Sequence, residues 1–162
     1  MARRAAIRLV GSSERVPRDA LTLLEPDFVL DSDSHILVFY LFEPARLSAP
    51  ALEALLAAEN TDGIVASAAS IGDLWYASHK TGPKSLAPGV YESVRRTLLD
   101  PGTNLEVAPV LASTMEYFTS VPLAELGDPF DRFILATAAQ LRLPLVTVDR
   151  AISNTGAVEV IR

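Results

Sequence analysis

The sequence predicts an α/β protein, a three-layer sandwich with a mostly parallel central sheet of four to five strands. Short apolar runs ending in polar turns alternate with longer segments of helical periodicity. This alternation implies βαβ units, whose crossover connections place helices on both faces of the sheet. The chain has 162 residues, of which 49% are hydrophobic, and can therefore bury one substantial core.

The first half of the chain supplies two expected strands and three expected helices. Pro44 stops the first helix, Ser48 opens the second, and Asn60 with Gly63 closes it. The third helix runs through Ile71, and a loop rich in Gly, Pro and Lys follows it. In order, the elements are strand 28–30, helix 36–42, helix 51–59, strand 64–66, a helix through residues 71–75 and the loop 80–89.

The second half supplies three helices and two or three further strands. Pro101 and Gly102 end the first of these helices. The longest helix has the strongest start signal, with Asp128 suited to the N-cap and Pro129 to the first helical position. In order, the elements are helix 90–99, strand 105–110, helix 114–118, helix 128–141, strand 145–148 and a weaker strand 158–161.

Residues 1–25 show no useful periodicity, and we interpret them as an N-terminal extension ahead of a domain over residues 26–162. In the first eighteen residues five arginines face only Glu14, whereas the whole chain has a formal net charge of -6. The extension is either a mobile basic arm for RNA or partner contact, or a tail without function. An acidic body argues against a broad basic surface for nucleic acid, but not against a metal-dependent nuclease. The arginines are Arg3, Arg4, Arg8, Arg15 and Arg18.

The composition limits the kinds of metal site that the chain can form. The chain has no cysteine, which excludes disulfides and thiolate metal sites, and a zinc centre would need both histidines, His35 and His79. A hard cation bound by oxygen ligands is the natural expectation. No segment resembles a secretory signal or a membrane span, so a cytoplasmic protein is expected.

Acids follow two of the predicted strands directly. Asp31 and Asp33 come after the first strand, and Asp149 follows the fourth. Ligands of such sheets bind outside the carboxyl ends of the strands. Asp131 adds a second acid to a first turn that Asp128 already caps, while Asp73, early in its helix, taken alone is an ordinary first-turn acid.

Three blocks of sequence resemble the VapC-type toxins of the PIN-domain family. The first is Asp33-Ser34-His35 with the apolar helix and Pro-containing turn after it. The second is Ser67-Ala68-Ala69-Ser70 with Asp73. The third, and most specific, runs from Asp128 to Asp149 and includes Asp131-Arg132-Phe133-Ile134-Leu135-Ala136-Thr137-Ala138. The resemblance covers roughly residues 28–152.

The resemblance implies an endoribonuclease that depends on Mg²⁺ or Mn²⁺. Converging carboxylates repel one another unless a divalent cation neutralises them, and that cation can polarise a phosphate and activate water. We expect Asp33 and Asp131 to be principal ligands, with Asp73 and Asp149 acting through water or a second metal. The implied catalytic and metal-binding residues are Asp33, Asp73, Asp131 and Asp149, with Asp31 and Asp128 as additional candidates.

Two departures from the family pattern bear on the site. Asp73 replaces the usual Glu and is one methylene shorter, and either Asp31 or Asp33 could be the first acid, with Asp33 favoured by its spacing to Pro44. The resemblance also implies a homodimer and a cognate antitoxin whose C-terminal segment covers the acidic pocket. Arg132 and Arg150 flank the acids and are expected to engage substrate phosphate or the inhibitory partner.

Other cations and aromatic residues have two interpretations each. Lys80 and Lys84, like Arg95 and Arg96, either contact phosphates or form a solvated face. Trp75 and Tyr76 either stack on bases or pack in the core or a dimer interface. His35 is expected to pack structurally.

Two alternatives to the nuclease stay open. A haloacid-dehalogenase-like phosphatase would use the Asp31–Asp33 motif, but it needs a late lysine, and none follows Lys84. The second alternative is a catalytically weak or inactive PIN-like module that binds a partner, which the shortened side chain of Asp73 supports.

Overall fold

The computed structural model describes residues 28–30, 35–61, 63–82 and 85–162. The predicted N-terminal extension, like the acids Asp31 and Asp33, lies outside these residues. No helix within the described ranges is long and apolar enough to cross a membrane.

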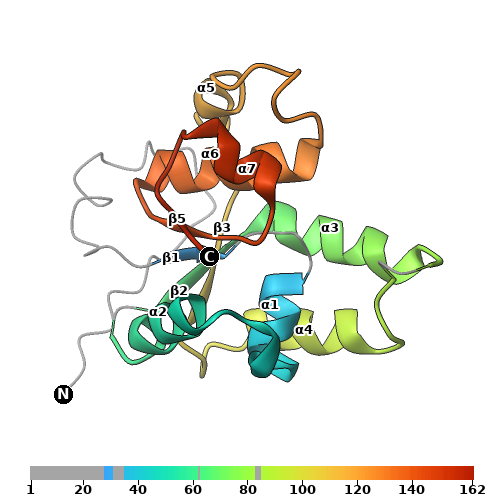
Figure 1. The fold of residues 1–162 in the computed structure, drawn as a ribbon. Helices are drawn as coiled ribbons and strands as arrows, with labels where there is room; N and C mark the ends of the chain where they lie inside the picture. The colour runs from blue at the N-terminus through green and yellow to red at the C-terminus, as the bar shows by residue number, and fades with distance from the viewer. Residues whose placement is uncertain (1–27, 31–34, 62, 83–84) are drawn as a thin grey trace, which may run out of the picture.

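The described part of the chain forms a five-stranded sheet in which every pairing is parallel (Figure 1). The strand order is β3-β2-β1-β4-β5, so the first strand lies at the centre. This confirms the predicted parallel sheet and includes the weaker fifth strand. The strands are β1 (Phe28–Leu30), β2 (Ile64–Ser67), β3 (Leu105–Ala108), β4 (Leu145–Val146) and β5 (Val160–Ile161).

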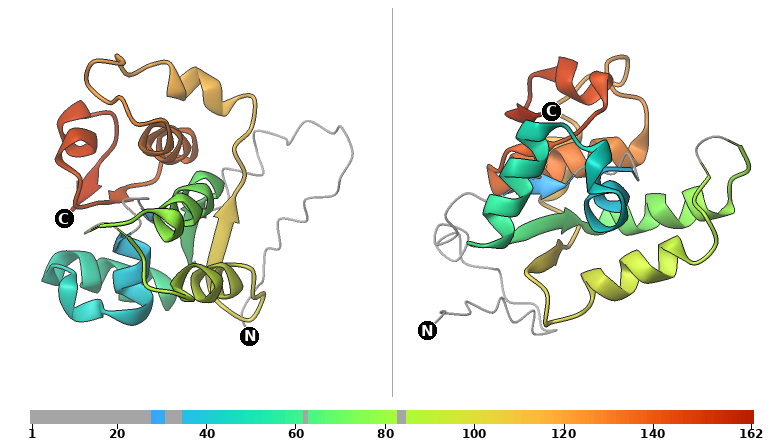
Figure 2. Two further views of the ribbon diagram at one scale, coloured as in Figure 1. Left: turned by 90° about the vertical axis from the view of Figure 1, so that its right-hand side faces the viewer. Right: turned by 60° about the horizontal axis from the view of Figure 1, so that its bottom comes forward.

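Helices cover both faces of the sheet. In Figure 1, α5, α6 and α7 lie above it and α1, α2 and α4 below it, which confirms the three-layer sandwich. Figure 2 shows that α3 and α4 run side by side and project beyond the sheet. The helices are α1 (His35–Phe42), the 3₁₀ helix η2 (Pro44–Arg46), α2 (Ala49–Glu59), α3 (Ala68–His79), α4 (Val90–Leu98), α5 (Thr114–Phe118), α6 (Pro129–Leu141) and α7 (Arg150–Thr155).

The core is divided by the sheet into two clusters, because successive side chains of a strand point to opposite faces. Ile64 and Ala66 of β2 belong to the cluster formed with α1, α2 and α4, whereas Val65 packs against the cluster of α6 and α7. Likewise Val146 joins the first cluster and Leu145 the second. Strands β2 and β4 therefore contribute side chains to the core on both faces, as expected for a parallel sheet.

Short elements account for the main differences from the prediction. Neither η2 nor α7 was expected, since three and six residues are too few to show a helical period. The predicted strand 145–148 ends at Val146, because the amide of Asp149 bonds to the hydroxyl of Thr147 and the Asp149 side chain then caps α7. The apolar run extends past the strand into this turn.

Candidate active site at the carboxyl edge of the sheet

The three central strands end level with one another. Leu30 of β1 is in register with Ala66 of β2 on one side and Val146 of β4 on the other. Because β2 and β4 lie on opposite sides of β1, the chain leaves this edge in two directions, which makes it the topological switch point of the sheet. The candidate site is therefore expected at this edge, where β2 leads into α3 and β4 leads toward α7.

Two contacts show that α3 and α6 pack antiparallel beside this edge. The hydroxyl oxygens of Ser67 and Thr137 lie 3.0 Å apart and are buried. Five residues along α3, Gly72 faces Phe130, and a Cβ atom on Gly72 would lie 3.0 Å from that ring. Residue numbers therefore rise along α3 as they fall along α6: position 67 lies beside position 137, and position 72 lies beside position 130.

This packing places two of the predicted acids at the same end of the helix pair. Asp73 follows Gly72, Asp131 follows Phe130, and both acids are partly buried. Asp131 also lies in the first turn of α6, where the positive end of the helix dipole favours a carboxylate.

Asp128 and Asp149 cap helices in the same way. Asp128 Oδ1 accepts hydrogen bonds from the amides of Phe130 (2.8 Å) and Asp131 (3.3 Å), and Pro129 occupies the first position of α6. Asp149 Oδ1 accepts from two amides at the start of α7. The capping interpretation of Asp128 is confirmed, whereas the cap at Asp149 was not anticipated because α7 itself was not. In both residues the bonds use Oδ1 and leave Oδ2 outside the cap.

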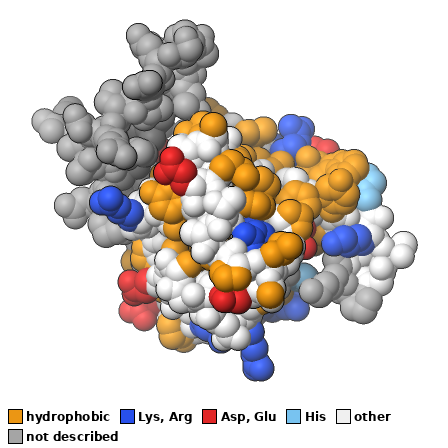
Figure 3. Space-filling model, turned by 90° about the horizontal axis from the view of Figure 1, so that it is seen from above, with side chains coloured by type: hydrophobic (Ala, Val, Ile, Leu, Met, Phe, Trp, Pro, Cys, Tyr) orange, Lys and Arg blue, Asp and Glu red, His pale blue; other side chains and the backbone are white. Residues whose placement is uncertain are grey.

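We predict that Asp33, Asp73, Asp131 and Asp149 converge. The described residues do not test this in full, because Asp33 is not among them. Within the described ranges, no three His, Asp or Glu side chains are grouped so that they could hold a metal ion. On the face seen from above, acidic side chains lie at separate points (Figure 3). Asp73, Asp131 and Asp149 by themselves therefore do not form a metal centre.

Ser70 is a polar residue of this region that was predicted as part of the Ser67–Ser70 block but not as a residue of the site. It has 1% exposure, and its hydroxyl has no hydrogen-bond partner among the residues described. The signal was present in the sequence, since residues 67, 70, 74 and 77 form the buried stripe of α3. Together with the carboxylates, this hydroxyl gives an all-oxygen donor set, which fits a hard divalent cation.

Arg132 has a different role from the one expected. It is only 6% exposed, and its guanidinium donates to the carbonyls of Leu126 (2.7 Å), Val121 (2.7 Å), Phe118 (2.5 Å) and, more weakly, Pro122 (3.4 Å). It also lies 4.8 Å from the ring centroid of Phe118. Arg132 therefore ties the segment after α5 to the start of α6 and is not presented to a substrate.

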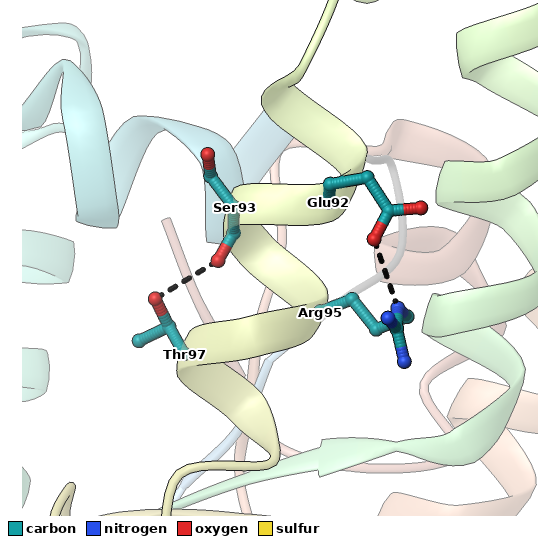
Figure 4. A network of polar contacts seen from close by, with 4 residues as sticks. All are labelled: Glu92, Ser93, Arg95 and Thr97. Carbon is teal, nitrogen blue, oxygen red and sulfur yellow. Dashed lines mark hydrogen bonds and ion pairs between the residues drawn. The ribbon is translucent and has the colours of Figure 1, made fainter.

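The other predicted substrate-binding cations are at the surface or outside the described ranges. Lys80 and Arg150 are exposed, and Lys84 is not described. Arg95 pairs with Glu92 one turn earlier on α4 at 3.2 Å, with both side chains exposed (Figure 4). This agrees with a solvated face for Arg95, and contact of Lys80 or Arg150 with phosphate stays a prediction.

The aromatic residues of α3 are not part of the core of this chain. Trp75 is 44% and Tyr76 51% exposed. The Tyr76 ring lies 5.5 Å from that of Phe130, and the Trp75 ring 4.3 Å from that of His79. The remaining interpretations, base stacking and a dimer interface, both require an exposed face.

Comparison with known proteins adds a family match over most of the chain. The sequence model of the PIN domain matches residues 32–158. The chain is also 30% identical over 122 residues to Ribonuclease VapC22 of Mycobacterium tuberculosis, covering 75% of this chain and 88% of that protein.

Two solved structures share the fold. VapBC2 from Rickettsia felis bound to a DNA fragment from its promoter has a TM-score of 0.59 at 17% identity, covering 83% of this chain and 96% of that one. DNA-bound VapBC from Salmonella typhimurium has a TM-score of 0.58 at 19% identity, covering 85% and 98%.

Proposed function

Since this chain belongs to the PIN-domain family, we propose that it is an endoribonuclease dependent on Mg²⁺ or Mn²⁺ and the toxin of a toxin–antitoxin pair. The observation that carries the proposal is the family match over residues 32–158, which spans Asp33, Asp73, Asp131 and Asp149. The similarity to a VapC ribonuclease supports RNA as the substrate. Family membership removes the phosphatase alternative.

In the proposed site, the four aspartates would hold the divalent ion. Such an ion supplies a Lewis acid for the scissile phosphate and favours ionisation of a water nucleophile. Asp131 enters the site as a carboxylate favoured by the start of α6, and Asp73 enters from the facing helix. Asp149, fixed through Oδ1 at the start of α7, can offer Oδ2.

The shorter side chain of Asp73 need not prevent this role. Gly72 allows the backbone of α3 to approach the ring of Phe130 closely, since any larger residue would have to displace that ring. A close approach of α3 to α6 reduces the distance that an acid on α3 has to span. The packing thus supports an active site with Asp in place of Glu.

We also propose a cognate antitoxin as partner and a homodimer as the assembly. The similar solved structures are VapBC toxin–antitoxin complexes, and an antitoxin segment covering the acidic residues would block substrate access. Arg150 is exposed and next to Asp149, and is therefore a candidate cation for an acidic group of that partner. The absence of cysteine agrees with action in the cytoplasm, where the proposed substrate occurs.

The test is cleavage of mixed structured and single-stranded RNAs by purified protein with Mg²⁺, with Mn²⁺ and with EDTA, beside Asp131→Asn. We expect metal-dependent cleavage by the wild type and a loss of at least about a hundredfold in the variant, because the amide lacks the charge that holds the cation. Asp128→Asn is the matched control, since Asn caps helices as well as Asp does, and it should retain cleavage.

A second candidate is a catalytically inactive module that only binds a partner, which the replacement at Asp73 favours. Folded wild-type protein that neither cleaves RNA nor binds Mn²⁺ would support it against the nuclease. Asp73→Glu separates the two further, because restoring the longer acid should not diminish an active enzyme and could restore an inactive one.

A further inference from the structure

Two buried serines, Ser67 at the N-cap of α3 and Ser70 in its first turn, differ in their bonding. The Ser67 hydroxyl accepts from the amide of Ala69 (3.3 Å) and lies 3.0 Å from the hydroxyl of Thr137. Thr137 itself donates to the carbonyl of Phe133, so Ser67 is the donor between the two hydroxyls. Ser70 is equally buried, at 1% exposure, but its hydroxyl has no partner in the described part of the chain.

Threonine hydroxyls of α4, α5 and α6 find a partner on the backbone of their own helix. Thr97 donates to the carbonyl of Ser93 (Figure 4), and Thr119 and Thr137 bond in the same way to the carbonyl four residues earlier. This back-bonding is the usual solution for a buried Ser or Thr in a helix. Ser70 does not use it, although Ala66 lies four residues earlier at the end of β2.

An unbonded buried hydroxyl lowers stability, and an alanine would fit the same backbone with a better helix propensity. The serine at position 70 therefore needs a reason other than folding. A group of this kind in a native structure commonly marks a place where a ligand, ion or water supplies the missing bond.

Ser70 lies beside a predicted acid. Ser70 and Asp73 are three residues apart on α3, so their Cβ atoms are neighbours on one face of the helix. Gly72, between them, contacts Phe130, the residue before Asp131. The close approach of α3 to the start of α6 therefore occurs at the level of Ser70 and Asp73, and Ser70 itself lies on the buried stripe of α3 that it shares with Leu74.

We propose that Ser70 is a further residue of the active site, whose hydroxyl oxygen accepts a hydrogen bond from a water of the hydrated divalent cation held at Asp73. The inference rests on the proposed metal-dependent function. Mg²⁺ and Mn²⁺ retain bound waters in sites built from few carboxylates, and each such water, whose oxygen is bound to the metal, donates its hydrogens to acceptors on the protein. Ser70 is a positioning residue in this scheme, because it acts through the water and not on the substrate.

The test compares Ser70→Ala with the matched variant Ser67→Ala, each in the full-length chain. The affinity for Mn²⁺ alone is measured by electron paramagnetic resonance, and urea unfolding is measured in EDTA. We expect Ser70→Ala to bind Mn²⁺ roughly tenfold more weakly, as is typical for loss of an outer contact, and to unfold at the same or a higher urea concentration than the wild type. Ser67→Ala should show the reverse, with lower stability and unchanged Mn²⁺ affinity.

Either of two results would reject the proposed role of Ser70 and leave the proposed metal-dependent function intact. If Ser70→Ala binds Mn²⁺ as tightly as the wild type, the Ser70 hydroxyl does not contact the hydrated ion. If Ser70→Ala unfolds at as low a urea concentration as Ser67→Ala, the hydroxyl has a structural role. Failure of the wild-type protein to bind Mn²⁺ is distinguishable from both, since it would reject the metal-dependent function and this inference with it.

Discussion

The helices α3 and α6 meet beside the same edge of the sheet, but they use their polar residues differently. At the start of α6, Asp128 bonds two amides and buried Arg132 bonds four carbonyls. At the start of α3, the N-cap Ser67 is fully bonded, whereas Ser70, equally buried, is not. Arg132 keeps one unbonded nitrogen, Nε, but its other two side-chain nitrogens tie it to the backbone, whereas the Ser70 hydroxyl has no bond in the described part of the chain.

The comparison therefore separates two kinds of substitution. Changes at Arg132, Asp128 or Ser67 remove bonds that hold the chain and should appear in the free energy of unfolding. A change at Ser70 removes no bond between described residues and should appear in metal binding. Asp131 lies between the two cases, because it occupies the first turn of α6 but was predicted as a ligand.

The largest effect on stability is expected for Arg132→Met. The variant leaves the carbonyls of Phe118, Val121 and Leu126 without their donor, and each buried group left unpaired costs about 1–3 kcal/mol. We expect a loss of roughly 3 kcal/mol or more in the free energy of unfolding, measured in urea. Arg132→Lys keeps the charge but not the planar fork of donors, and should fall between this variant and the wild type.

The same pair of variants tests the earlier expectation that Arg132 engages substrate. If Arg132 is structural, the folded fraction of Arg132→Lys should cleave RNA with an unchanged KM. A raised KM at unchanged stability would show that Arg132 binds substrate. The polar residues at the start of α6 would then not serve folding alone, contrary to the comparison with α3.

A smaller effect is expected for Asp128→Ala, which removes the cap of α6. Such a loss costs about 1 kcal/mol, whereas Asp128→Asn should lie within a few tenths of the wild type because Asn caps equally well. Urea unfolding of the three proteins checks both values. A loss of cleavage in Asp128→Asn without a loss of stability would show that the carboxylate has a role beyond the cap.

The smallest effect is expected at a site remote from the edge. Glu92 and Arg95 form an exposed pair one turn apart on α4, and Glu92→Gln should cost only about 0.2–0.5 kcal/mol. The difference should disappear in high salt, as screening of an exposed pair requires. A loss comparable to that of Asp128→Ala would mean that exposed pairs contribute as much as bonded caps, and it would weaken the comparison.

Local signals in the sequence determined the order of strands and helices. Apolar runs with a polar exit gave the strands, Ser48 and Asp128 were recognised as helix starts, and the βαβ alternation gave the parallel sheet. These features depend on residues within one turn or one strand of each other, so the chain alone contains them. The helix α7 and the cap at Asp149 were missed because six residues carry too weak a period.

Only the tertiary structure decided which polar residues are bonded. The carbonyl partners of Arg132 lie 6 to 14 positions earlier in the chain, and the partner of Ser67 lies 70 positions away. No local pattern reports such contacts, since they arise when helices pack and loops close. From sequence, Arg132 therefore resembled a cation ready for phosphate and Ser70 an ordinary member of a motif, whereas packing buried both and supplied partners to only one.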